Sequence, residues 1–180
     1  MSKLIKSSCK VQMRPLGLDH GSIKTAAEII SLSFASDPLI RWLSRDRSGP
    51  GWETLTPTLQ QWQEARLRDY ARIGIMMESH NDFEERIKKK YPPNSLYYLE
   101  IAAVRPDSQG MGVGRAIMQW VVQELGASPC YIECTDQKNV AFYLKYGFEL
   151  VEEAELVDEE DAMPPTTLFY MIRDTSKLNN

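Results

Sequence analysis

The residue types that most clearly suggest chemistry lie in one glycine-rich segment, Gln109-Gly110-Met111-Gly112-Val113-Gly114-Arg115. It follows an apolar run and precedes apolar residues at helical spacing, so it predicts a turn from a strand into a helix, with Gly126 at the C-cap of that helix. Glycines let a backbone approach a ligand, and the free amides and dipole at a helix start favour phosphate. Arg115 adds a positive charge at this turn. The segment therefore indicates a phosphate-binding loop.

Three phosphate-binding patterns can be compared with this loop. Neither Gly110 nor Gly112 begins the GxGxxG of dinucleotide-binding folds, although Glu133, about 20 residues further on, keeps that interpretation open. A P-loop ends in Gly-Lys-Ser/Thr, and the chain has Gly-Arg-Ala at 114–116 instead. The remaining pattern, Gln/Arg-x-x-Gly-x-Gly/Ala, is matched by residues 109–114.

A second segment, residues 139–148, predicts a short helix in which Asn139 suits the N-cap and Gly147 the left-handed position after the end. The loop and this segment, in this order and at this separation, resemble the two motifs of the GNAT acetyltransferase superfamily. Residues 97–148 resemble most the puromycin N-acetyltransferase group with its fungal relatives, and residues 37–43 resemble the N-terminal half of that group.

The resemblance implies an α/β fold: one GNAT-like domain over residues 1–180, with a mixed sheet flanked by helices and a cofactor-binding core at 96–148. It implies an acetyl-CoA-dependent N-acetyltransferase that needs no metal and moves the acetyl group directly to a primary amine of a small molecule. The alternative is a non-catalytic acyl-CoA-binding protein or a decayed relative that keeps the loop.

The resemblance also implies roles for individual residues. Strands at 97–104 and Cys130–Cys134 would diverge and hold the pantetheine arm between them, and Tyr143 would protonate the leaving thiolate. The implied cofactor-binding residues are Ala103, Val104, Gln109, Gly110, Met111, Gly112, Val113, Gly114, Arg115 and Asn139.

The general base is left open by the sequence. Glu100 and Glu133 sit in otherwise apolar strands, where an unpaired carboxylate is costly, so either could accept the ammonium proton directly or through water. The alternative is that each is bonded to a neighbouring arginine or backbone group and has no catalytic role. His20 and His80 lie in polar, loop-like surroundings, and we expect neither to act as the base.

The elements upstream of the loop depart from the family pattern. We expect a helix capped by Asp19 or Ser22 that ends before Asp37-Pro38. Between the first helices and residue 96 the sequence shows no Asn-Gly turn and no pair of strands, so the early antiparallel hairpin is expected to be reduced or missing. The predicted elements of this half are an edge strand at 11–16, helices at 57–70 and 83–91, and a possible strand at 73–77.

The composition of the chain limits the kinds of partner that it is expected to bind. Lys and Arg number 21 against 25 Asp and Glu, a net charge of −4, which argues against a nucleic-acid partner held by overall positive charge. The three cysteines lack CxxC spacing, so neither a disulfide framework nor a zinc site is expected. Without a signal-like apolar region or a run of about 20 apolar residues, we expect a cytoplasmic protein with no membrane partner. The oligomeric state is not predicted. The acidic run at 149–161 is expected to be a solvated strand end and loop.

Overall fold

The computed structural model describes residues 19–34, 37–43, 59–159 and 164–176. The chain divides into two compact units, one from residues 1–34 and 101–126 and the other from residues 35–100 and 127–180. The predicted edge strand at 11–16 lies outside the described residues.

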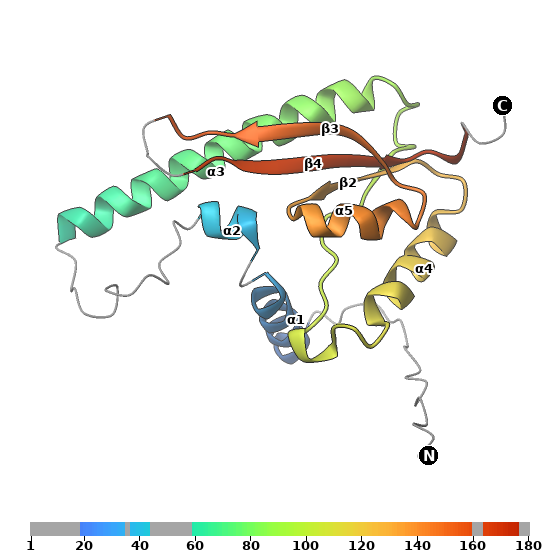
Figure 1. Ribbon diagram of the computed structural model, residues 1–180, viewed down its shortest axis with the longest axis horizontal. Helices are drawn as coiled ribbons and strands as arrows, with labels where there is room; N and C mark the ends of the chain where they lie inside the picture. The colour runs from blue at the N-terminus through green and yellow to red at the C-terminus, as the bar shows by residue number, and fades with distance from the viewer. Residues whose placement is uncertain (1–18, 35–36, 44–58, 160–163, 177–180) are drawn as a thin grey trace, which may run out of the picture. The chain divides into compact units, whose positions relative to one another are not determined.

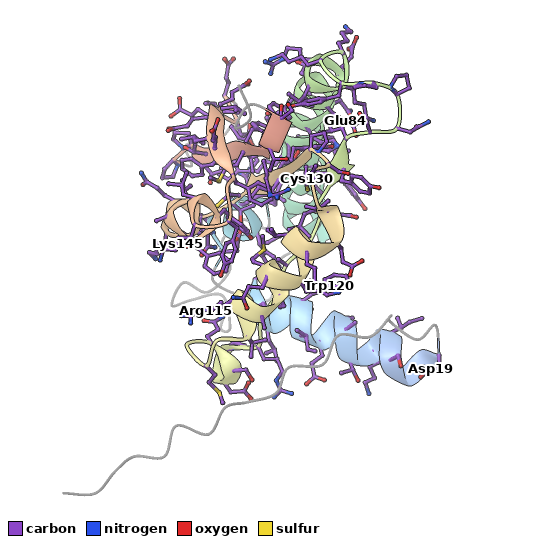
Figure 2. All side chains as sticks on the ribbon, turned by 90° about the vertical axis from the view of Figure 1, so that its right-hand side faces the viewer. Asp19, Glu84, Arg115, Trp120, Cys130 and Lys145 are labelled. Atoms are coloured by element: carbon purple, nitrogen blue, oxygen red, sulfur yellow. The ribbon has the colours of Figure 1, made fainter. Side chains whose placement is uncertain are left out.

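The first unit contains helices α1 (His20–Ser33) and α4 (Val113–Leu125) and the 3-10 helix η1 (Pro106–Ser108). Asp19 is the N-cap of α1, as predicted, because its carboxylate accepts a hydrogen bond from the Ser22 amide at 2.9 Å (Figure 2). Helix α4 ends at Gly126, whose φ of 55° confirms the C-cap glycine expected from the sequence.

The second unit is built on a four-stranded sheet (Figure 1). In spatial order the strands are β1 (Tyr97–Tyr98), β2 (Cys130–Cys134), β4 (Thr166–Arg173) and β3 (Glu149–Leu156). The β1–β2 pair is parallel and the other two pairs are antiparallel, so the sheet is mixed, as predicted. The predicted strand at 97–104 is wrong in length, because only its first two residues join the sheet.

Helices cover both faces of this sheet. On one face, α2 (Pro38–Leu43) and α3 (Leu59–Lys88) form a buried core with the side chains of β2, β3 and β4. The rings of Phe83 and Tyr170 stack there with centroids 4.0 Å apart. Helix α5 (Gln137–Leu144) contacts β2 and β3, and Figure 1 shows it on the side of the sheet away from α3. The expected mixed α/β fold, a sheet flanked by helices, is confirmed.

Helix α3 replaces the early hairpin. The sequence predicts two separate helices here with a possible strand at 73–77, but a single helix of 30 residues runs from Leu59 to Lys88. The buried and half-buried side chains of Met76, Phe83 and Ile87 continue at helical spacing past Gly74, so one apolar stripe is kept along the helix. The strand prediction is therefore wrong: residues 59–88 are helical and form no hairpin, and no strand precedes Tyr97 among the described residues.

Two arginines of α3 bind carboxylates of the acidic run. Arg72 is fully buried, and its Nε donates to Asp158 Oδ2 at 3.0 Å. Arg86 donates hydrogen bonds from Nη1 and Nη2 to the two carboxylate oxygens of Glu152, each at 2.8 Å. The expectation that the acidic run is merely solvated is thus wrong for Glu152 and Asp158, which tie α3 to the region of β3.

Within the described ranges, none of the helices combines the length and the apolar character that crossing a bilayer requires.

Candidate functional site

The glycine-rich loop has the backbone conformation that its sequence suggests. Gly110 and Gly112 have φ angles of +75° and +90°, in the left-handed region that side chains rarely adopt. No heavy atom lies within 4 Å of the position that a Cβ would take at either glycine. The side chain of Gln109 donates to the Val104 carbonyl at 3.1 Å and braces the start of the loop. The loop is thus held in shape with open space beside it.

The start of α4 presents unpaired amides and a positive charge. Gly112 caps the helix without a side-chain hydrogen bond, and the first helical bond runs from the Ala116 amide to the Gly112 carbonyl at 3.0 Å. The amides of Val113, Gly114 and Arg115 therefore have no partner inside the helix. The first turn holds no acidic residue, and the Arg115 side chain is exposed there (Figure 2). The positive end of the helix dipole and the positive charge of Arg115 lie together at the N-terminus of α4, and both favour binding of an anion.

Strand β2 has a free edge on its β1 side. Only Cys130 and Tyr131 pair with β1, and the ladder ends with the Leu99 amide donating to the Tyr131 carbonyl at 3.0 Å. Since β2 continues to Cys134, its residues 132–134 have no partner in β1. Main-chain groups on such an edge can bind an extended ligand as an added strand would. Ala103 and Val104 follow β1 outside any strand, and both are half-buried.

The free part of β2 carries a carboxylate paired with a histidine. Glu133 is half-buried, and its Oε1 is hydrogen-bonded to Nδ1 of His80, which lies in α3. The expectation that His80 sits in a loop is therefore wrong: the helix places it against the sheet. The two residues are separated by 53 positions, and no local pattern signals such a contact.

Aromatic side chains surround this pair. The ring of Tyr98 lies 5.6 Å from the His80 ring and stacks on Tyr131 at 4.5 Å. The Tyr131 hydroxyl donates to Glu84 Oε1 at 3.1 Å. Burial, followed by the negative charges of Glu133 and Glu100, raises the pKa of Tyr98, and burial and the bond to Glu84 raise the pKa of Tyr131. Both phenols therefore stay neutral at physiological pH.

Tyr143 comes from α5, on the opposite face of the sheet. Its ring makes edge contacts with Phe142 at 5.4 Å and Phe148 at 6.0 Å. Burial, with a smaller contribution from nearby Cys134, raises the pKa of Tyr143 to about 12, so its hydroxyl keeps a proton at neutral pH. Successive side chains of a strand point to opposite faces, so Glu133 lies on the α3 side and Cys134 on the α5 side. Glu133 and Tyr143 thus lie on opposite faces of the sheet, on either side of β2.

Two other candidates lie differently from the prediction. The N-cap of α5 is Asp136, whose side chain accepts from the Lys138 amide at 3.0 Å. Asn139 is inside the first turn and exposed, so its capping role is wrong. Asp136 precedes the helix by one residue, as an N-cap does, which is the signal that would have identified it. Glu100 lies beyond the end of β1 and is exposed rather than part of a buried strand.

Residues 69–150 match a family model described as "Acetyltransferase (GNAT) domain". This segment, a little under half of the chain, includes most of α3, the glycine-rich loop, α4, β2 and α5. This segment is therefore similar in sequence to a GNAT acetyltransferase domain.

Two solved structures are also similar. One is described as histone acetyltransferase HPA2 and related acetyltransferase from Corynebacterium glutamicum; it is 15% identical, with a TM-score of 0.48, over 87% of this chain and 92% of that chain. The other is nourseothricin acetyltransferase, 26% identical with a TM-score of 0.36, over 46% of this chain and 52% of that chain. Both TM-scores are below 0.5, so neither likeness bears on the roles of individual residues.

Proposed function

We propose that residues 1–180 form one acetyl-CoA-dependent N-acetyltransferase domain with its cofactor-binding core at 96–148. The acceptor is a primary amine of a small molecule, the transfer is direct, and the enzyme works in the cytoplasm. The proposal is supported most by one observation: the segment that matches a GNAT acetyltransferase domain contains a left-handed glycine loop with open space beside it. Within the superfamily, the sequence resemblance to the puromycin N-acetyltransferase group is part of this proposal.

Each part of the donor has a proposed place. The pyrophosphate of acetyl-CoA binds the amides of residues 110–115, where the helix dipole and Arg115 favour an anion. The pantetheine arm binds main-chain groups at Ala103 and Val104 and on the free edge of β2. Asn139, exposed in the first turn of α5, is the remaining proposed cofactor contact.

The proposed chemistry is aminolysis of a thioester. The amine attacks the carbonyl carbon, and Tyr143 protonates the departing thiolate. Glu133 or Glu100 accepts the proton of the amine, directly or through an intermediate group. The protonated state of Tyr143 and the half-buried position of Glu133 support these assignments. Glu100 is the weaker candidate, because it is exposed.

One observation favours a second function. Helix α3 takes the place of the antiparallel hairpin expected in the family, so the acceptor side differs from the family pattern. A non-catalytic acyl-CoA-binding protein would keep the loop and tolerate that change.

The experiment that separates the two functions is a mass-spectrometric screen of primary amines with acetyl-CoA. An N-acetyltransferase produces acetylated amine together with free coenzyme A in stoichiometric amounts. Binding of acetyl-CoA without any acetylated product over the whole screen would support the binding protein instead.

A further inference from the structure

The contact between His80 and Glu133 resembles the carboxylate–imidazole arrangement that prepares a histidine for proton transfer. Glu133 Oε1 binds Nδ1 of the ring, and an ionised carboxylate can only accept, so Nδ1 carries the hydrogen. In a neutral imidazole the lone pair is then on Nε2. A carboxylate on Nδ1 fixes both the tautomer and the orientation of the ring.

The Nε2 atom is available to a substrate. Among the described residues His80 Nε2 makes no hydrogen bond, and it is not one of the buried polar atoms that lack a partner, so solvent reaches it. The His80 side chain is 18% exposed, whereas that of Glu133 is 14% exposed and has His80 on its Oε1. Both side chains are half-buried, and the imidazole offers Nε2 as a proton acceptor while the carboxylate holds Nδ1.

The surroundings suit an amine that carries an aromatic or apolar group. Tyr98 of β1 lies 5.6 Å from the imidazole and is 36% exposed, with Tyr131 of β2 stacked behind it. Glu84 of α3, one turn beyond His80, already binds the Tyr131 hydroxyl and pairs with Lys88 at 2.7 Å, so the carboxylate that attracts an approaching ammonium group is that of Glu133. An aromatic ring beside carboxylates can contact both ends of such an acceptor.

We infer that His80 is the general base of the reaction and that Glu133 positions it. This inference rests on the proposed function and deepens it. The acceptor nitrogen attacks the thioester carbon, so a C–N bond forms and the C–S bond breaks. Before this attack the acceptor ammonium group loses one proton to His80 Nε2; after it the nitrogen loses its second proton to water, and the thiolate takes the proton of Tyr143. Solvent then removes the proton from His80 and restores the one on Tyr143. Glu133 exchanges no proton with the substrate.

The first test reads the tautomer and needs no activity. The chain has two histidines, so His20→Gln leaves the His80 imidazole as the only one in the spectrum. At pH 8.5, long-range ¹⁵N–¹H spectra show which ring nitrogen carries the hydrogen. We expect Nδ1–H in this variant and a shift toward Nε2–H when Glu133→Gln is added. An Nε2–H ring in the His20→Gln protein would overturn the inference.

The second test compares two nucleophiles, with release of coenzyme A from acetyl-CoA as the readout. 2-Phenylethylamine is protonated at pH 7.5 and needs a base, whereas hydroxylamine is neutral and does not. His80→Ala should lower the rate with 2-phenylethylamine by about 10²–10⁴, leave the hydroxylamine rate within about threefold, and recover in part with added imidazole. Ser79→Ala, which removes a neighbouring bond from α3 to Tyr170, is the folding control and should keep both rates.

The outcomes separate the inference from the proposed function. An equal loss with both nucleophiles, or no recovery with imidazole, would contradict a base role for His80. A parent protein that releases coenzyme A with neither nucleophile would contradict the proposed enzyme, and the tautomer measurement would still decide how the His80 ring is held.

Discussion

Replacing Tyr143 by phenylalanine separates the role of its hydroxyl from the role of its ring. The ring contacts to Phe142 and Phe148 are unchanged by this substitution, and among the described residues no hydrogen bond to the hydroxyl is formed. We therefore expect the free energy of unfolding to change by less than about 0.5 kcal/mol, as for substitutions that break no specific interaction.

The catalytic effect should be much larger. If the hydroxyl protonates the thiolate, turnover should fall by about 10²–10⁴, the usual contribution of a positioned acid. This range corresponds to about 2.7–5.5 kcal/mol of transition-state stabilisation. Because the pKa of Tyr143 is raised to about 12, the acid is fully protonated at the pH of a neutral assay.

Tyr170→Phe is the matched control. The Tyr170 hydroxyl is within 2.9 Å of the Ser79 hydroxyl, so its removal should cost about 1 kcal/mol of stability, or about 2–4 °C in Tm for a chain of this size. Turnover should be retained. The assay follows coenzyme A release with 2-phenylethylamine, beside thermal unfolding of both variants. A Tyr143→Phe protein with turnover within about threefold of the parent, or with the larger loss of stability, would refute the general-acid role.

Stability measurements should rank the arginine pairs by burial. Asp158→Asn removes the charge that pairs with the buried Arg72, and it should cost about 3–5 kcal/mol of unfolding free energy in urea. Glu152→Gln acts on the exposed pair with Arg86 and should cost less than about 1 kcal/mol. Equal losses in the two variants would contradict this ranking. Burial raises the pKa of the Cys130 thiol from 9.0 to about 11, so its contribution is complete below pH 9 and lost as the pH rises to about 11. The urea midpoint should fall over that interval, and less steeply in Cys130→Ala; parallel profiles of the two proteins would contradict this.

The elements set by local signals were predictable from the sequence. Strand β2 at Cys130–Cys134 has the expected bounds, because its apolar residues lie between clear turn signals. The C-terminal glycine of α4 was predicted correctly, since Gly126 has a positive φ. Gly147 likewise has a φ of 82°, as the helix before it requires. In each case the information lies within a few residues.

Features that depend on distant contacts were not predictable in the same way. The charged residues of α3 gave no sign that one helix would run from Leu59 to Lys88, because its continuity depends on a buried stripe packed against the sheet. The length of β1 depends on where its partner β2 stops pairing. The bond between His80 and Glu133 joins a helix to a strand, so polarity alone assigned His80 wrongly.

Calorimetric titration of coenzyme A into the parent protein, Gly112→Asp and Gly112→Asn tests the central claim most directly. Both substitutions place a side chain at a left-handed glycine with open space beside it, and only aspartate adds a charge. Two like charges about 4 Å apart repel by about 1 kcal/mol in water and about 4 kcal/mol near a protein surface, so Gly112→Asp should bind about fivefold to about 10³-fold more weakly than Gly112→Asn.

Gly126→Asp places the same residue at the glycine of positive φ that ends α4, and it should bind coenzyme A as the parent does. Tight binding by the parent, with the loss confined to Gly112→Asp, is the predicted result. Equal affinity of folded Gly112→Asp and Gly112→Asn proteins, or a parent that does not bind coenzyme A, would contradict a phosphate site at this loop.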